Sequence, residues 1–166
     1  MAESFRGEFT QKVDAKARVS IPAPFRRALE AGDSAQGAGP RVVIVYGGDR
    51  QYLECYSIAE MARIERSIAR MPIGSPQRKY LERHMITLSQ TVEIDTDGRI
   101  VLQAKSRDKI GMGALKEGAE AVFAGTLNKF QIWHRDQYDA DVAAQDDGVL
   151  DAGQDMLSLL PADPED

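Results

Sequence analysis

Two pairs of oppositely charged residues share one spacing in this chain. Asp14 and Arg18 are four residues apart, and so are Asp95 and Arg99. An Asp at the start of a tight turn can accept backbone N–H groups and fix the loop. The Arg then either folds back on the Asp, as an ion pair worth little when exposed, or projects from a stiff loop to bind phosphate or a guanine edge. The spacing alone leaves both interpretations open.

The two pairs belong to an internal repeat. Residues 13–23 align with residues 94–104 at an offset of 81, with Asp, Arg and alternating apolar residues in matching places. A second matched block, residues 52–57 against 129–134, has an offset of 77, so the second copy has lost about four residues in its loops. A repeat must be recognised first, because it determines the fold. Two copies are too few for a solenoid and predict a pseudo-two-fold pair that closes one core.

Each copy is predicted to run strand, Asp-x-x-x-Arg turn, strand, short helix, two further strands and a helix. Alternating apolar residues predict half-buried strands over residues 19–21 and 100–102. Pro22 and Pro24 end the first of these strands and can open a helical turn over residues 25–29.

The connection between the copies is predicted to be helical. Ser57 can cap a helix whose apolar residues recur at helical spacing as far as Met71, with Glu60 at the capping-box position. Prolines in residues 72–76 end that helix, and a further helical stretch leads into the second copy. The predicted domains are a first repeat with its helix over residues 5–72, a second over 73–140, and an acidic, disordered tail over 144–166.

Composition excludes several classes of protein. A chain of 166 residues, 43% of them hydrophobic, is typical of one compact domain or two intimate halves. No apolar run approaches the ~18 residues that span a bilayer, and the N-terminus lacks the apolar core of a signal peptide. The single cysteine, Cys55, cannot form an internal disulfide and is interpreted as a buried packing thiol. We therefore expect a cytoplasmic protein with no membrane partner.

The net charge of −5 is unevenly distributed. From His134 to the C-terminus there is one base against ten acids, whereas the other 133 residues hold 20 bases and 16 acids. This acidic composition predicts the disorder of the tail, within which residues 156–160 are interpreted as an apolar patch or a short docking helix. Residues 1–27 hold six bases and three acids, so the first Asp-x-x-x-Arg loop is basic, whereas the second is locally acidic.

No combination of residues predicts an enzyme. His84 and His134 are isolated and, with one cysteine, make no zinc-ligand pattern. The sequence has no phosphate loop, dinucleotide-binding turn or nucleophile elbow. A pairing of Asp14 with Asp95, as in aspartic proteases, needs two carboxylates within hydrogen-bond reach, but each has its own Arg. We predict no catalytic residues, no metal, no cofactor and no small-molecule substrate.

The two loops differ at one position. Gly98 follows Asp97 in an Asp-Gly turn signal, where positive φ is allowed. Ala17 occupies the matching place, where a left-handed conformation is costly, so we expect the first loop to differ in shape. The flanking bases Lys12 and Lys16 nevertheless favour phosphate contact by the first loop, and oligomerisation would add avidity.

The ordered set of motifs resembles the MraZ family of bacterial regulators. The resemblance rests on residues 5–8, 13–26, 95–100 and 123–133, and it covers roughly residues 5–140. It implies an α+β fold related to AbrB-type DNA-binding domains, in which two pseudo-symmetric β-rich halves form a swapped-hairpin or double-split barrel with short flanking helices. It also implies a ring of about eight or more subunits. Such a ring binds repeated short boxes upstream of its own operon, in the division and cell-wall gene cluster, and usually represses it.

The resemblance also assigns roles to individual residues. It ties the first loop, with Asp14, Lys16 and Arg18, to DNA binding, and it extends to Asp95 and Arg99. With the flanking base Lys12 and the turn residue Gly98 added from the sequence, the predicted DNA-binding residues are Lys12, Lys16, Arg18 and Arg99, and the predicted loop-structuring residues are Asp14, Asp95 and Gly98. The family usually has glycine where this chain has Ala17. The expected partner is double-stranded DNA, bound at the nucleoid in the cytoplasm. The alternative is a ring-forming scaffold that binds a protein partner through its loops or its acidic tail.

Overall fold

The computed structural model describes residues 4–34 and 39–163. The chain divides into two compact units between Arg135 and Asp136. The first unit, here called the body, holds both copies of the repeat, and the second is here called the C-terminal unit. The last three residues of the predicted tail lie outside the described residues.

The elements of the body follow the order predicted for two copies. They are β1 (Glu8–Lys12), β2 (Arg18–Ser20), α1 (Ala23–Ala31), β3 (Arg41–Val45), β4 (Leu53–Tyr56), α2 (Ile58–Ala69), α3 (Pro76–Leu81), the π-helical turn η1 (Glu82–Thr87), β5 (Ser89–Glu93), β6 (Arg99–Val101), α4 (Ala104–Lys109), β7 (Glu120–Gly125) and β8 (Phe130–His134). Helix α5 (Arg135–Asp146) begins at the last residue of the body, and the 3₁₀ turn η2 (Met156–Leu159) follows it in the C-terminal unit.

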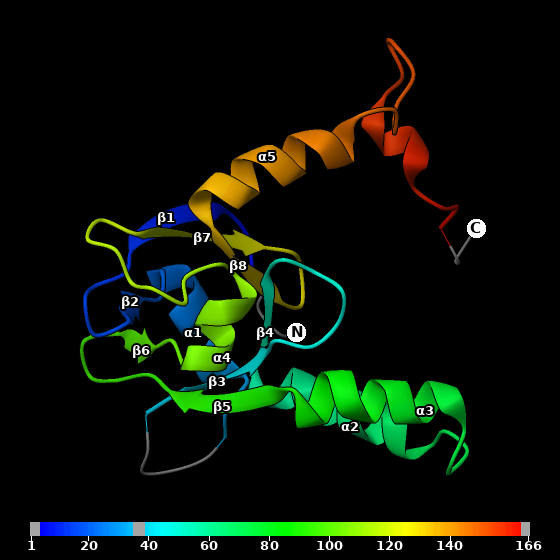
Figure 1. The fold of residues 1–166 in the computed structure, drawn as a ribbon. Helices are drawn as coiled ribbons and strands as arrows, with labels where there is room; N and C mark the ends of the chain where they lie inside the picture. Colours follow the sequence, from blue (N-terminus) through cyan, green and yellow to red (C-terminus); the bar gives the residue numbers. More distant parts are fainter. Residues whose placement is uncertain (1–3, 35–38, 164–166) are drawn as a thin grey trace. The chain divides into compact units, whose positions relative to one another are not determined.

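The order of the strands shows the two-fold relation between the copies (Figure 1). Six strands pair in the order β1-β7-β8-β4-β3-β5, and β2 pairs with β6 in a separate ribbon. If the two copies are exchanged, β1 takes the place of β5, β3 that of β7 and β4 that of β8. The strand order is then the same when it is read from the other edge of the sheet. The first strand of each copy therefore pairs with the third strand of the other copy. The predicted α+β fold of two pseudo-symmetric halves is confirmed.

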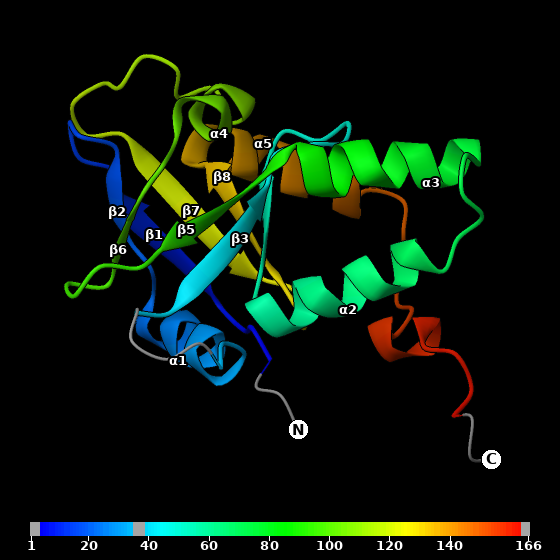
Figure 2. The ribbon, with the colours of Figure 1, turned by 90° about the horizontal axis from the view of Figure 1, so that it is seen from below.

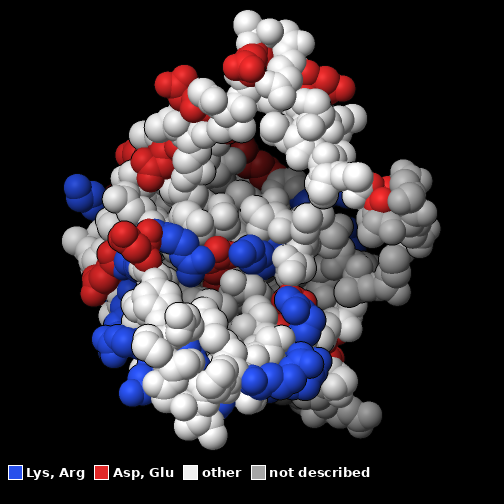
Figure 3. Space-filling model, turned by 90° about the vertical axis from the view of Figure 1, so that its right-hand side faces the viewer, with Lys and Arg blue, Asp and Glu red and all other residues white. Residues whose placement is uncertain are grey.

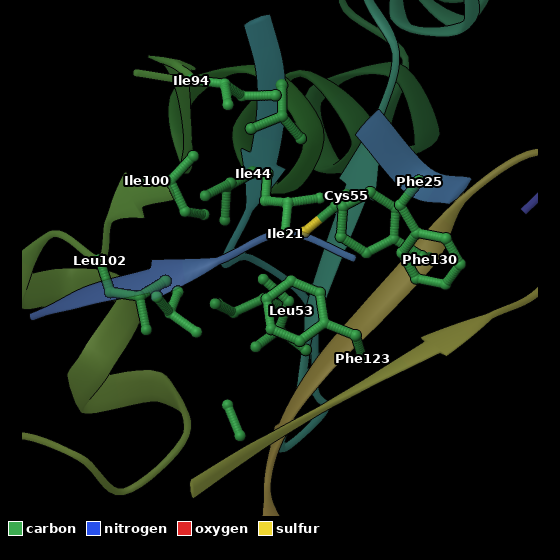
Figure 4. Packing of buried hydrophobic residues seen from close by; sticks show 14 of the residues in the cluster. Ile21, Phe25, Ile44, Leu53, Cys55, Ile94, Ile100, Leu102, Phe123 and Phe130 are labelled. Atoms are coloured by element: carbon green, nitrogen blue, oxygen red, sulfur yellow. The ribbon is translucent and has the colours of Figure 1, made fainter. Parts of the chain in front are cut away.

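One hydrophobic core joins the two copies (Figure 4). Phe25 of α1 and Phe130 of β8 are fully buried, with ring centroids 4.9 Å apart, and the Phe5 ring lies 5.5 Å from Phe25. Cys55 lies in the same cluster with no exposed surface, which confirms the buried thiol, and burial raises the pKa of that thiol. Because strands and core side chains are shared, neither copy can bury its apolar face alone.

Helix α2 is capped as predicted. The Ser57 hydroxyl accepts a hydrogen bond from the Glu60 N–H at 3.1 Å. The Glu60 carboxylate turns instead to Arg63 at 2.6 Å and Asn128 at 2.9 Å, so it does not complete a capping box. Figures 1 and 2 show that α2 and α3 form a hairpin that extends away from the strands.

The C-terminal unit is largely exposed and acidic. Its 3₁₀ turn begins where the Asp155 carboxylate accepts a hydrogen bond from the Leu157 N–H at 3.1 Å. The side chains of Met156 and Leu160 are 69% and 66% exposed. The disorder assigned to this part of the sequence stays a prediction.

Candidate nucleic-acid interface

Asp14 fixes the first loop through its backbone. The Asp14 Oδ1 atom accepts hydrogen bonds from the backbone N–H groups of Lys16 and Arg18, both at 2.9 Å. The Ala17 N–H donates to the Asp14 carbonyl oxygen at 3.0 Å and closes the turn. The hydrogen bond from the Arg18 backbone N–H group is the main reason why the pKa of the Asp14 carboxyl is lowered. The carboxylate is therefore ionised at neutral pH and stabilises the turn in that form.

The second loop repeats this geometry. The Asp95 Oδ1 atom accepts hydrogen bonds from the N–H groups of Asp97 and Arg99, both at 2.9 Å. The Gly98 N–H donates to the Asp95 carbonyl oxygen at 3.0 Å. The pKa of the Asp95 carboxyl is also lowered, mainly by the hydrogen bond from the Arg99 backbone N–H group. The two loops therefore share one pattern of backbone hydrogen bonds.

The expectation that Ala17 changes the shape of the first loop is wrong. Ala17 has a φ of 63°, in the left-handed region, and Gly98 in the matching place has a φ of 78°. A residue with a Cβ adopts this conformation at a cost of about 1–2 kcal/mol. The hydrogen bonds from the residues on both sides of Ala17 to Asp14, and burial of the Ala17 side chain, offset that cost.

Gly98 lies against the side chain of Arg26. A Cβ at this position would overlap the guanidinium group of Arg26, with the Arg26 Cζ only 2.8 Å away. The Arg26 Nη1 atom donates a hydrogen bond of 3.0 Å to the Ile21 carbonyl oxygen, which fixes the guanidinium. In the other copy Arg107 makes the equivalent bond to Leu102 at 2.8 Å.

We expect Gly98→Ala to lower the free energy of unfolding by about 1–2 kcal/mol from the strained φ alone, with a further loss because Arg26 must move. The reciprocal change, Ala17→Gly, should alter it by less than about 1 kcal/mol, because relief of strain is offset by backbone entropy and by lost methyl burial. Urea unfolding of both variants measures the difference. Equal losses in the two variants would contradict this account of the loops.

The ribbon of β2 and β6 links the two loops to each other. The Ile21 N–H donates to the Gly98 carbonyl oxygen at 2.9 Å, and the Leu102 N–H donates to the Ala17 carbonyl oxygen at 2.8 Å. Each loop is thus bonded both within itself and to the chain that follows the short strand of the other copy. Figures 1 and 2 show both loops on the same side of the molecule, opposite the α2–α3 hairpin.

The two arginines are held differently. The Arg18 Nε atom donates to Asp14 Oδ2 at 2.7 Å, and among residues 4–34 and 39–163 neither terminal nitrogen of Arg18 has a hydrogen-bond partner. The Arg99 Nη2 atom instead donates to Asp97 at 3.2 Å, and its Nε atom lies 3.5 Å from the Asp95 carboxylate. The terminal nitrogens of Arg18 are therefore accessible, whereas the Arg99 guanidinium lies against two acids of its own loop.

The predicted lysines flank the first loop. Lys16 is exposed at the loop itself, and Lys12 is exposed at the end of β1. Lys12 pairs across the sheet with Glu120, whose carboxylate accepts a 2.7 Å hydrogen bond from Arg135. On the second loop, Arg99 lies beside Asp95 and Asp97. The basic part of the predicted site is therefore the first loop.

Sequence reasoning missed one part of this surface. The Val13 N–H donates to the Ala119 carbonyl oxygen at 2.9 Å, which brings the segment before β7 beside the first loop. That segment carries Lys116, which is exposed. No motif marks Lys116. Its place beside the first loop is evident only from the structure, in which Ile94 makes the equivalent bond to Pro40 in the other copy.

Neither a metal-ligand cluster nor a pair of bonded carboxylates is found at the loops of the described residues. Among them no group of three or more His, Cys, Asp or Glu side chains can hold a metal ion. The Asp14 and Asp95 carboxylates each bond within their own loop, which does not support the protease-like pairing considered above. Within residues 4–34 and 39–163, no helix is both long and apolar enough to cross a membrane.

The lowered pKa values of Asp14 and Asp95 predict an acid-dependent stability. Both carboxyls have a folded pKa below the ordinary value of 3.8. Each ionised carboxylate therefore stabilises the folded state fully at pH values above 3.8, and this stabilisation is lost as the pH falls through the lower folded pKa. Asp14→Asn should therefore lower the melting temperature at pH 7, and the difference from wild type should shrink towards about pH 2. Thermal unfolding across this range checks it. An undiminished difference at low pH would show that the charge of Asp14 does not act in this way.

An α+β body with exchanged strands and two Asp-fixed loops defines a pseudo-symmetric protein of the swapped-hairpin class. The model of the family described as "MraZ protein, putative antitoxin-like" matches residues 4–84 and 85–157, one match for each copy. The chain is 61% identical over 163 residues to the transcriptional regulator MraZ of Cereibacter sphaeroides (strain ATCC 17029), covering 96% of this chain and 97% of the relative.

Two further relatives extend the comparison. The transcriptional regulator MraZ of Ruegeria pomeroyi is 43% identical over 166 residues, covering 98% of this chain and 92% of the relative. That of Nitrosococcus oceani is 29% identical over 156 residues, covering 94% of this chain and 98% of the relative. The chain therefore belongs to the MraZ family of transcriptional regulators, and the resemblance found in the sequence is confirmed.

Proposed function

We propose that this regulator is a sequence-specific DNA-binding protein that represses the operon containing its own gene, in the bacterial division and cell-wall gene cluster. One observation carries the proposal: Asp14 holds the Arg18 guanidinium on a stiff, basic loop while the terminal nitrogens of Arg18 remain available. A guanidinium held in this way suits phosphate oxygens or the edge of guanine. The protein would then act in the cytoplasm, at the nucleoid.

The proposal includes a ring of about eight or more subunits. The first loop of a single body offers few bases, so useful affinity requires several such loops on one DNA molecule. The α2–α3 hairpin exposes Ile73, Tyr80 and Ile86, by 91%, 54% and 39%, which supports a contact between subunits. A ring would present successive first loops to boxes about one helical turn, roughly 10 base pairs, apart.

A second candidate function is a ring-forming scaffold that binds a protein partner. The C-terminal unit exposes large apolar side chains among acidic residues, namely those of Met156, Leu157, Leu159 and Leu160. Partner binding would then depend on this unit and not on Arg18.

Titration of a labelled duplex from directly upstream of the gene distinguishes the two functions. We expect wild type and a Leu157→Ser/Leu160→Ser double variant to bind equally, with affinity that falls steeply between about 50 and about 200 mM salt. Light scattering checks that the oligomer is the same in both proteins. An intact wild-type oligomer that does not bind would contradict the DNA-binding proposal and favour the scaffold.

A further inference from the structure

Each Asp-x-x-x-Arg loop borders a surface hollow, and the repeat relates the two hollows. The first hollow, of about 580 Å³, lies between residues 12–15 and residues 115–118. The second, of about 600 Å³, lies between residues 93–98, the Gly39–Pro40 segment and helix α1. Equivalent 2.9 Å hydrogen bonds, Val13 N–H to Ala119 and Ile94 N–H to Pro40, hold the two walls of each hollow together.

The two hollows differ in charge, because the first has as many bases as acids and the second is strongly acidic. The second is lined by four carboxylates and one base, which are Glu30, Glu93, Asp95, Asp97 and Arg26. The first is lined by two bases and two acids, which are Lys12, Lys116, Asp14 and Glu117. Asp14 is already bonded to Arg18 at 2.7 Å. At the repeat offset of 81, Lys12 takes the place of Glu93, so the sequence reverses the charge at an equivalent position.

A firmly anchored turn presents Lys116 at the first hollow. The Ala119 N–H donates to the Lys116 carbonyl oxygen at 3.2 Å, and Gly118 has the φ of +79° that this turn requires. On the N-terminal side, Met112 is buried and Leu115 packs against the core. The Lys116 side chain itself is exposed, and no ion pair holds it among residues 4–34 and 39–163.

We propose that the first hollow seats a phosphate group of the DNA backbone, contacted by Lys12 from one wall and by Lys116 from the other. This inference rests on the proposed function and adds to it a contact from outside the repeated motif. The second hollow repels the backbone, because its carboxylates carry the same sign of charge as phosphate. DNA therefore runs along the first copy of each subunit, beside Arg18. The two copies of the repeat, although related by a pseudo-two-fold axis, do not contact the DNA equivalently.

The salt dependence of DNA binding tests this seat directly. Each neutralised phosphate contributes about 0.9 to the slope of log affinity against log salt. Lys116→Gln should reduce the magnitude of that slope by about 0.9 for each subunit engaged. The ratio of wild-type affinity to Lys116→Gln affinity should therefore be about threefold larger at about 50 mM salt than at about 200 mM salt, for each subunit engaged. Glu117→Gln, one residue away, should raise affinity, because it removes a negative charge from the same hollow.

A matched control comes from the opposite side of the molecule. Figure 3 views the side on which the α2–α3 hairpin lies, where Lys and Arg side chains also gather. The hairpin carries Arg66, Arg70, Lys79 and Arg83 as exposed bases. Lys79→Gln removes the same charge as Lys116→Gln, and it should leave the slope unchanged.

The outcomes separate this inference from the proposed function. The probe is the duplex from directly upstream of the gene, and all proteins are full chains with their oligomers checked by light scattering. If wild type binds and Arg18→Ala does not, the proposed function stands. An unchanged slope for Lys116→Gln would then overturn the phosphate seat alone, as would a slope reduced equally by Lys79→Gln. A reduced slope for Lys116→Gln with a raised affinity for Glu117→Gln establishes the seat.

Discussion

Arg18→Ala should abolish tight binding to upstream DNA, whereas Arg99→Ala should weaken it far less. A well-oriented guanidinium contact to a base edge is worth about 1–3 kcal/mol, which is about 5- to 150-fold in affinity for one subunit. Several subunits on one duplex multiply this factor. The terminal nitrogens of Arg18 have no hydrogen-bond partner among the described residues, whereas Arg99 already bonds Asp97 at 3.2 Å on an acidic loop. The two substitutions remove the same side chain from equivalent positions of the repeat, so each serves as the control for the other.

Fluorescence titration of the upstream duplex with both variants measures this difference. Circular dichroism and light scattering must show the same fold and oligomer as wild type, because Arg18 also helps to hold Asp14. Equal losses for the two variants would show that both copies contact DNA alike. A larger loss for Arg99→Ala would place the main contact on the second loop and contradict the proposed orientation.

Phe25→Ala should lower the free energy of unfolding by about 3–5 kcal/mol, because it leaves a cavity at a fully buried aromatic site. The Phe25 ring lies 4.9 Å from Phe130 and 5.4 Å from Phe9, so it joins the first helix of one copy to the last strand of the other. Exchanged strands and this shared cluster make the body one cooperative unit. We therefore expect one unfolding transition, shifted as a whole.

Denaturant unfolding followed by tryptophan fluorescence and by circular dichroism checks this expectation. Trp133 lies in the second copy, so its signal reports on the copy that does not carry the substitution. Val149→Ala is the control, because that side chain is 57% exposed in the C-terminal unit and its loss should cost far less. Two separate transitions, with only one shifted by Phe25→Ala, would show that the halves fold independently.

Much of the fold follows from the repeat in the sequence. Matching Asp, Arg and alternating apolar residues at one offset require equivalent strands, and two copies without further neighbours must close on each other. Local chemistry also predicted the Ser57 cap, and the structure confirms it. These features depend on residues close together in the chain, where propensity and capping rules apply.

Other features depend on the hydrogen bonds of a whole loop or on contacts between the copies, which propensity and capping rules do not describe. Ala17 keeps a left-handed φ because hydrogen bonds of its neighbours to Asp14 over-determine the loop, and this overrides its own preference. Glycine at position 98 has a positive φ and also lies against Arg26 of the other copy, which would have to move to make room for a side chain. Lys116 is about a hundred residues from the first loop in the chain, and only the pairing of β1 with β7 brings them together.

A hydroxyl-radical footprint of the DNA upstream of the gene tests the central claim most directly. Bound by the wild-type oligomer, this DNA should show repeated protected boxes on one face of the duplex, spaced by about one helical turn, roughly 10 base pairs. The protection should disappear with Arg18→Ala at the same protein concentration. Uniform protection without boxes, or no protection by an intact oligomer, would contradict the claim that this protein reads a repeated DNA sequence through its first loop.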